Sequence, residues 1–159
     1  MAAKKSKRAD ESKFDTILVA VDGSGHAVKA IRLAIELAKR FDSRLLMLSV
    51  YKHYSSLESA HSLARAGKLP EPPDVTLRAI GRDAVESAKE RAKEAGLKKI
   101  EGTVKRGPPA RTIVKFAKDK NVDVIIMGSR GLGDIEGFFL GSVSHKVSAL
   151  AECTCIVVK

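Results

Sequence analysis

Aromatic side chains, cysteines and long apolar runs are all scarce in this chain of 159 residues. Tryptophan is absent and aromatic residues make up 4%, so the stacking platforms that bind single-stranded nucleic acid are few. Cys153 and Cys155 fit neither a disulfide framework nor the CxxC spacing of a zinc site. No apolar run approaches the roughly 18 residues of a membrane span, and the N-terminal "MAAKKSKRADESK" is not followed by the apolar segment of a signal peptide. We therefore expect a cytoplasmic protein that does not enter a membrane.

The formal net charge of +10 is the kind of balance found in proteins that bind polyanions. Residues 1–13 hold five basic and two acidic side chains, and the other charges are spread along the chain without a dense block. This distribution predicts a weak, salt-sensitive affinity for polyanions and no specific nucleic-acid site. We expect residues 1–13 to form a basic, disordered tail. The length and the 44% apolar content predict that residues 14–159 form one domain.

Apolar runs and helical spacings alternate along the chain. Strands are predicted within residues 15–24, 44–51, 98–107, 122–128 and 153–159. Helices are predicted over residues 25–40, 77–95, 108–121 and 142–151, and Gly96 is a candidate C-terminal cap for the second of them. Residues 52–74 are rich in proline and predict a long, partly irregular connection. The alternation predicts an α/β fold, a three-layer α/β/α sandwich with a five-stranded parallel, Rossmann-like sheet.

Ligands of such sheets bind beyond the carboxyl ends of the strands, where the connections diverge. This rule selects three places in the chain: residues 22–24, Val50 with Tyr51, and the segment that begins at Gly128. The last of these reads "GSRGLGDIEGFFLGSVSHK". No GxxxxGK[ST] string occurs in the chain, which excludes a P-loop. "DGSGHA" lacks the third glycine of a dinucleotide fingerprint and "GLGDIEG" has the wrong spacing, which argues against a Rossmann oxidoreductase.

The remaining pattern is Gly128-x2-Gly131-x9-Gly141-Ser142. Glycines at the end of a strand can present bare N–H groups, the ingredients of an anion-binding nest. The helix predicted to begin near Gly141 and Ser142 would add unpaired N–H groups and a partial positive charge, with the hydroxyl of Ser144 nearby. The same residues would also serve a plain loop in which Ser142 only caps a helix. The spacing by itself leaves both interpretations open.

The strings "ILVAVDGS", "GSRGLG" and "LGSVSHKV", together with this spacing, resemble the universal stress protein family, and specifically its ATP-binding branch. The resemblance covers residues 15–158. It implies an adenine nucleotide alpha hydrolase-like fold, a homodimer, and ATP, with or without Mg²⁺, at the carboxyl edge of the sheet. It further implies a nucleotide site made of Ala20, Val21, Asp22, Val50, Met127, Gly128, Arg130, Gly131, Gly141, Ser142, Val143 and Ser144.

Within that site, the resemblance places Asp22 at the ribose and Ala20, Val21 and Val50 around the adenine, with the residues from Gly128 onward on the phosphate and ribose side. Each has another interpretation. Asp22 could cap the helix that follows it, because aspartate is a favoured cap. Val50 would be core in either case, and Arg130 could be a solvated loop charge.

The chain departs from the family pattern at two places. Many members have Gly-Gly where this chain has Gly133-Asp134, and Asp134 with Glu136 would either repel phosphates or help to hold a divalent cation. The usual Cys-Pro-Val before the last strand is Cys153-Thr154-Cys155 here. That strand is the family's usual dimer edge, so the resemblance implies a homodimer through Thr154, Ile156 and Val158 whose geometry is open.

The function expected from this reasoning is that of an ATP-binding stress-response regulator. Nucleotide would order residues 128–140 and shift the binding of a protein partner. The alternatives are slow ATP hydrolysis or self-phosphorylation at the same site, and an interaction module without nucleotide. We expect no catalytic residue, because the four histidines have no motif role and are predicted to lie on the surface.

Overall fold

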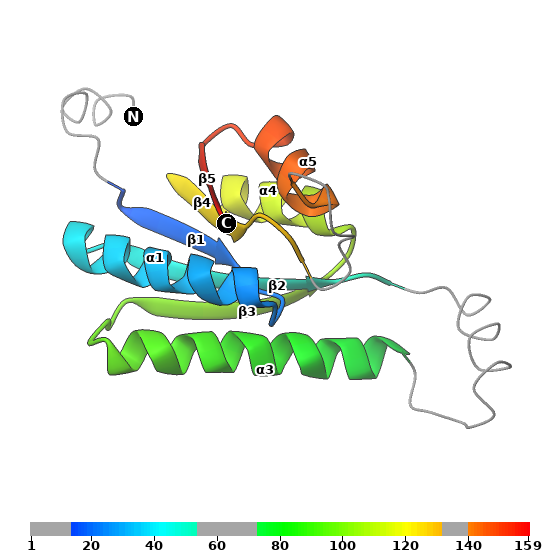
Figure 1. Ribbon diagram of the computed structural model, residues 1–159, viewed down its shortest axis with the longest axis horizontal. Coiled ribbons are helices and arrows are strands. Elements are labelled where there is room, and N and C mark those ends of the chain that lie inside the picture. Colours follow the sequence, from blue (N-terminus) through cyan, green and yellow to red (C-terminus); the bar gives the residue numbers. More distant parts are fainter. Residues whose placement is uncertain (1–13, 54–72, 132–139) are drawn as a thin grey trace, which may run out of the picture.

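The computed structural model describes residues 14–53, 73–131 and 140–159. In that part of the chain, five strands and four helices alternate (Figure 1). They are β1 (Thr16–Ala20), α1 (Gly25–Phe41), β2 (Arg44–Tyr51), α3 (Pro73–Glu94), β3 (Ile100–Arg106), α4 (Pro109–Asp119), β4 (Val124–Gly128), α5 (Ser142–Leu150) and β5 (Thr154–Val158). The predicted order of strands and helices is confirmed. The tail predicted for residues 1–13 lies outside the described residues, as do most of the 52–74 connection, Asp134 and Glu136.

All five strands run parallel, in the order β3-β2-β1-β4-β5. The chain moves outward from β1 through β2 to β3, and then returns to the other side of β1 for β4 and β5. The connections that follow β1 and β4 therefore leave the sheet in opposite directions. A reversal of this kind opens a crevice beyond the carboxyl ends of the strands, which is where parallel sheets bind ligands.

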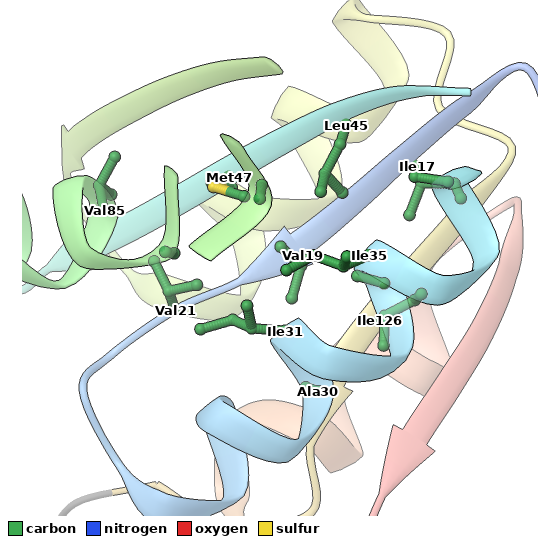
Figure 2. Close-up of a cluster of buried hydrophobic side chains, with 14 of the residues drawn as sticks. Ile17, Val19, Val21, Ala30, Ile31, Ile35, Leu45, Met47, Val85 and Ile126 are labelled. Carbon is green, nitrogen blue, oxygen red and sulfur yellow. The ribbon is translucent and has the colours of Figure 1, made fainter. Parts of the chain in front are cut away.

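The core consists of one apolar layer on each face of the sheet. Ile17 and Val19 of β1 pack into the layer under α1 and α3, and Figure 2 shows this cluster. Leu18, between them in sequence, packs into the opposite layer under α4 and α5. Because successive side chains of a strand point to opposite faces, a strand covered on both faces needs a continuous apolar run. That requirement explains the apolar run "ILVA" in β1.

The long helix α3 begins at Pro73, several residues before the expected start, since a first turn tolerates proline. Ile80 is half exposed, and Gly81 is the residue that approaches β2, where a Cβ atom would lie 3.0 Å from Ser49 Oγ. The helix ends at Glu94, and Gly96, the candidate C-terminal cap, has a φ of 89°. The N–H groups of Gly96 and Leu97 donate to the carbonyls of the last turn, a common C-terminal motif.

Strand β5 forms one edge of the sheet, and among the described strands it is paired with β4 alone. It begins at Thr154, so the strand forms without the proline that the family pattern usually has before it. None of the described helices combines the length and the apolar character that crossing a membrane requires.

Candidate functional site

A cavity of about 320 Å³ opens at the carboxyl edge of the sheet, beyond the ends of β1, β2 and β4. All but one of the residues predicted for the nucleotide site line it: Ala20, Val21, Asp22, Val50, Met127, Gly128, Arg130, Gly131, Ser142, Val143 and Ser144. Gly141 is the exception, and it is the N-cap residue of α5. The residues that sequence reasoning missed are Ala27, Leu48, Lys52, Pro109 and Ile113.

Asp22 lies in the turn between β1 and α1. Its Oδ1 atom accepts a hydrogen bond of 2.9 Å from the N–H of Ser24, while the Ser24 hydroxyl oxygen accepts one of 3.1 Å from the N–H of Ala27 and caps α1. The interpretation of Asp22 as the helix cap is therefore wrong. Its Oδ2 atom accepts no hydrogen bond within the described part of the chain, so this wall of the cavity carries an acceptor that a ligand hydroxyl can use.

Gly128, the last residue of β4, lies directly under the first turn of α1. A Cβ atom at this position would be 2.7 Å from the Cβ and 2.8 Å from the carbonyl carbon of His26. Separations this short do not occur between real side chains and backbone, so glycine is required by the packing of α1 on β4. The requirement for glycine here arises from the approach of a helix rather than from a free turn.

Ser129 is not part of the predicted glycine pattern, but its hydrogen bonds connect four elements. Its N–H donates to the carbonyl of Val158 at 2.7 Å. Its own carbonyl accepts from the N–H of Gly141 at 2.6 Å and from the hydroxyl of Ser144 at 3.0 Å. Its Oγ atom lies 3.3 Å from Nδ1 of His26. This buried serine therefore fixes the ends of β4 and β5 relative to α1 and α5.

The histidine prediction is wrong for one residue. His26 is half-buried and its ring contacts Ser129, whereas His53 and His145 are exposed as expected. His61 lies outside the described residues.

The N-terminus of α5 borders the cavity. Its cap is Gly141, which has no side chain to accept a hydrogen bond, so the interpretation of Ser142 as a capping residue is wrong. The first-turn N–H groups of Ser142, Val143 and Ser144 have no acceptor within the helix. The buried hydroxyl of Ser144 lies 3.0 Å from the carbonyls of Ser129 and Gly141, so it serves the local structure. Ser142 is exposed and leaves its hydroxyl to the cavity.

Positive charge comes to the cavity from Arg130 and Lys52. Arg130 is half-buried against the lining, so it is not a fully solvated loop charge. Asp22 is the one carboxylate among the described residues that line the cavity. The described residues contain no group of three or more histidine, cysteine or acidic side chains that could hold a metal ion.

Comparison with known proteins assigns the chain to a family. The model of the universal stress protein family matches residues 13–159. The chain belongs to that family. It is 37% identical over 150 residues to the universal stress protein YxiE of Bacillus subtilis, covering 92% of this chain and 99% of YxiE.

Two solved structures of universal stress proteins share the fold. UspA of Lactobacillus plantarum has a TM-score of 0.75 and 24% identity, with 94% of this chain and 100% of UspA covered. A universal stress protein in complex with cAMP has a TM-score of 0.69 and 24% identity, with 92% of this chain and 97% of that protein covered.

Proposed function

We propose that this universal stress protein binds ATP in the 320 Å³ cavity and acts as a nucleotide-dependent regulator. The observation that carries the proposal is the division of the cavity into an apolar part and a polar part. Ala20, Val50, Ile113 and Met127 supply apolar surface for a base. Ligand sites typically combine such a surface with a few placed polar groups, and volumes from about 300 Å³ are typical of small-molecule pockets.

The polar part suits a ribose and a phosphate chain. Oδ2 of Asp22 would accept a hydrogen bond from a ribose hydroxyl. The N–H groups at the start of α5 carry the positive end of the helix dipole, which favours phosphate. Arg130 and Lys52 add cationic side chains to the lining. The complex of another member of this fold with cAMP supports a nucleotide as the ligand class.

We infer regulation rather than rapid turnover. Asp22 is the only described carboxylate of the lining and would contact the ribose, and no described histidine lines the cavity, so the described lining offers no second acid–base group to activate an attacking water. Bound ATP would change the population of states that a partner protein recognises, to the extent that it binds those states with different affinity. The homodimer would form through Thr154, Ile156 and Val158 of the open edge strand β5, in the cytoplasm.

The test is calorimetric titration of ATP, with and without Mg²⁺, into the wild type and Gly131→Val, after acid extraction to detect nucleotide that co-purifies. Valine at position 131 would place branched side-chain atoms in the lining, so we expect the affinity to fall about tenfold or more, as for a lost charge-assisted contact. Gly25→Val is the matched control, because a Cβ atom at Gly25 meets nothing within 4 Å and the residue does not line the cavity.

Equal ATP binding by the wild type and Gly131→Val would show that the phosphates do not lie against this segment. A rate of phosphate release no faster than that of a protein-free control would exclude ATP hydrolysis as the function. Sedimentation of the wild type against Ile156→Lys tests the dimer, since a lysine in the centre of a paired edge strand should yield monomers.

A further inference from the structure

A second, larger cavity adjoins the first one. It has a volume of about 810 Å³ and lies between the N-terminal turn of α4 and the length of α5, next to the end of β2. The two cavities share Lys52, Pro109, Ser142 and Val143 as lining residues. A ligand that fills the first cavity can therefore continue into the second one without leaving the protein surface.

The charged side chains that line the second cavity are all basic or histidine: Lys52, His53, Arg111, His145 and Lys146. No described carboxylate is part of this lining. Asp74 lies beside it, but its Oδ2 atom contacts His53 Nδ1 at 2.9 Å and Arg106 Nη1 at 3.2 Å. A concave surface lined by charges of one sign concentrates ions of the opposite sign, so the cavity attracts anions.

Three cations of this cavity are available to a ligand. Lys52, Arg111 and Lys146 make no ion pair with any described carboxylate, whereas Lys115 and Lys118, farther along α4, pair with Asp119 and Glu152. Both helices also begin without a side-chain cap, since their N-cap residues are Pro108 and Gly141. The partial positive charge of each N-terminus adds to that of the side chains.

Apolar residues lie between these cations. Pro108, Pro109, Ala110, Ala149 and Leu150 are part of the lining. Leu150 is 53% exposed, which is unusual among the large apolar side chains of the described residues. An apolar surface bordered by cations matches a planar base joined to phosphates better than it matches an inorganic anion alone, because such a ligand uses both kinds of surface.

We propose that the second cavity holds the distal nucleoside and phosphates of a dinucleoside polyphosphate whose first nucleoside occupies the first cavity. This inference rests on the proposed function, because it requires a nucleotide in the first cavity. It adds a ligand class, two nucleosides joined by a phosphate chain. It also assigns Arg111 and Lys146 as phosphate contacts in addition to the residues of the Gly128-x2-Gly131-x9-Gly141-Ser142 pattern.

The experiment compares three ligands by calorimetry: ATP, adenosine 5′-tetraphosphate and diadenosine tetraphosphate. The second ligand has the phosphates of the third without its second nucleoside. We expect the wild type to bind diadenosine tetraphosphate about tenfold more tightly than ATP, with adenosine tetraphosphate between them. The double variant Arg111→Gln/Lys146→Gln should bind diadenosine tetraphosphate no more tightly than ATP. Its affinity for ATP should stay within about twofold of the wild-type value.

The matched control is Lys39→Gln/Lys93→Gln, which removes the same charge from exposed positions on α1 and α3. It should keep the full preference for the dinucleoside. Equal binding of ATP and diadenosine tetraphosphate by the wild type would overturn the inference and leave the proposed function standing. Adenosine tetraphosphate binding as tightly as the dinucleoside would overturn the site for a second nucleoside. A failure of all three ligands to bind would overturn the proposed function as well.

Discussion

The carbonyl oxygen of Ser129 accepts a hydrogen bond of 2.6 Å from the backbone N–H of Gly141. The first residue directly follows β4 and the second caps α5, so this bond holds the N-terminus of α5 at the carboxyl end of the sheet. The same oxygen lies 3.0 Å from the hydroxyl of Ser144, which strengthens the connection. The N–H groups that would face a phosphate chain are therefore positioned by the backbone of Ser129.

Replacement of Ser144 by alanine tests this connection. The hydroxyl is buried and donates to the carbonyls of Ser129 and Gly141. The Ser129 carbonyl keeps the N–H of Gly141 as a donor, so no buried acceptor is left without a partner there. We expect the free energy of unfolding to fall by about 1 kcal/mol, the net worth of one intramolecular hydrogen bond, measured by urea denaturation with circular dichroism.

The control for this prediction is Ser148→Ala in the same helix. The hydroxyl of Ser148 donates to the carbonyl of Ser144 one turn earlier, at 2.8 Å, and the residue is exposed. Its loss should change the free energy of unfolding by less than about 0.5 kcal/mol. If the two variants were equally stable, the hydroxyl of Ser144 would have no special part in holding α5.

Replacement of Gly128 by alanine tests the close approach of α1 to β4. The added methyl group would lie 2.8 Å from the backbone carbonyl carbon of His26, so the first turn of α1 would have to move. We expect a loss of about 1–3 kcal/mol in the free energy of unfolding, as for other overpacked sites, together with weaker ATP binding because Asp22 lies next to that turn.

Gly25→Ala tests a glycine where, in contrast to Gly128, an added methyl group has open space. A Cβ atom at Gly25 meets nothing within 4 Å, and alanine restricts the unfolded chain more than glycine does. This variant should gain up to about 1 kcal/mol in thermal or urea unfolding. A Gly128→Ala variant as stable as Gly25→Ala would mean that α1 does not pack on β4 as closely as the structure has it.

Much of the fold could be predicted from the sequence because burial on both faces of a parallel sheet leaves a local signal. Runs such as "ILVAV" and "RLLMLSV" need no knowledge of their neighbours to be read as buried strands. The start of α3 at Pro73 was missed because proline usually marks an interruption, and only its place in the first turn makes it compatible with a helix.

The residues of the candidate site also include some that the sequence could predict and some that it could not. Residues that follow β1 and β4 could be predicted, since every strand of a parallel sheet ends at the same edge. Pro109 and Ile113 could not, because they belong to α4 and reach the cavity only through the packing of that helix on the sheet. Ser129 was missed because its partners come from α1, α5 and β5, and no spacing within one segment encodes such a set.

The two cysteines should make the stability of the folded protein depend on pH. Desolvation by burial raises the pKa of the Cys153 thiol and of the Cys155 thiol above the ordinary value, and the neighbouring Cys153 raises the pKa of Cys155 further. As pH rises past the unfolded value of about 8.5, the unfolded chain loses these protons while the folded chain keeps them. Stability from these groups is therefore complete below that pH and falls as the pH approaches the folded values.

The measurement is the urea midpoint between pH 7 and pH 10 for the wild type and for Cys153→Ala/Cys155→Ala. The two proteins share every other ionisable group, so the difference between the two curves isolates the thiols. The wild type should lose more stability over this range than the double variant. Parallel curves would mean that the thiols have the same proton affinity in the folded and unfolded chains.

The carboxylate of Asp22 combines a structural contact with a proposed binding contact, and two substitutions separate them. Asparagine can keep an oxygen at the Oδ1 position, which accepts from the N–H of Ser24, but it replaces Oδ2 with a donor group. We expect Asp22→Asn to unfold like the wild type and to bind ATP about tenfold more weakly, because the ribose hydroxyl loses a charged acceptor. Asp22→Ala should lose both stability and affinity.

Ser24→Ala completes the set, because it removes the N-cap of α1 without touching the lining of the cavity. Loss of a serine cap costs about 1 kcal/mol, so this variant should be less stable than the wild type while its ATP affinity is unchanged. Calorimetric titration and urea unfolding of the three variants give the comparison. If Asp22→Asn bound ATP as tightly as the wild type, Oδ2 would not contact the ribose, and Asp22 would serve only the turn that leads into α1.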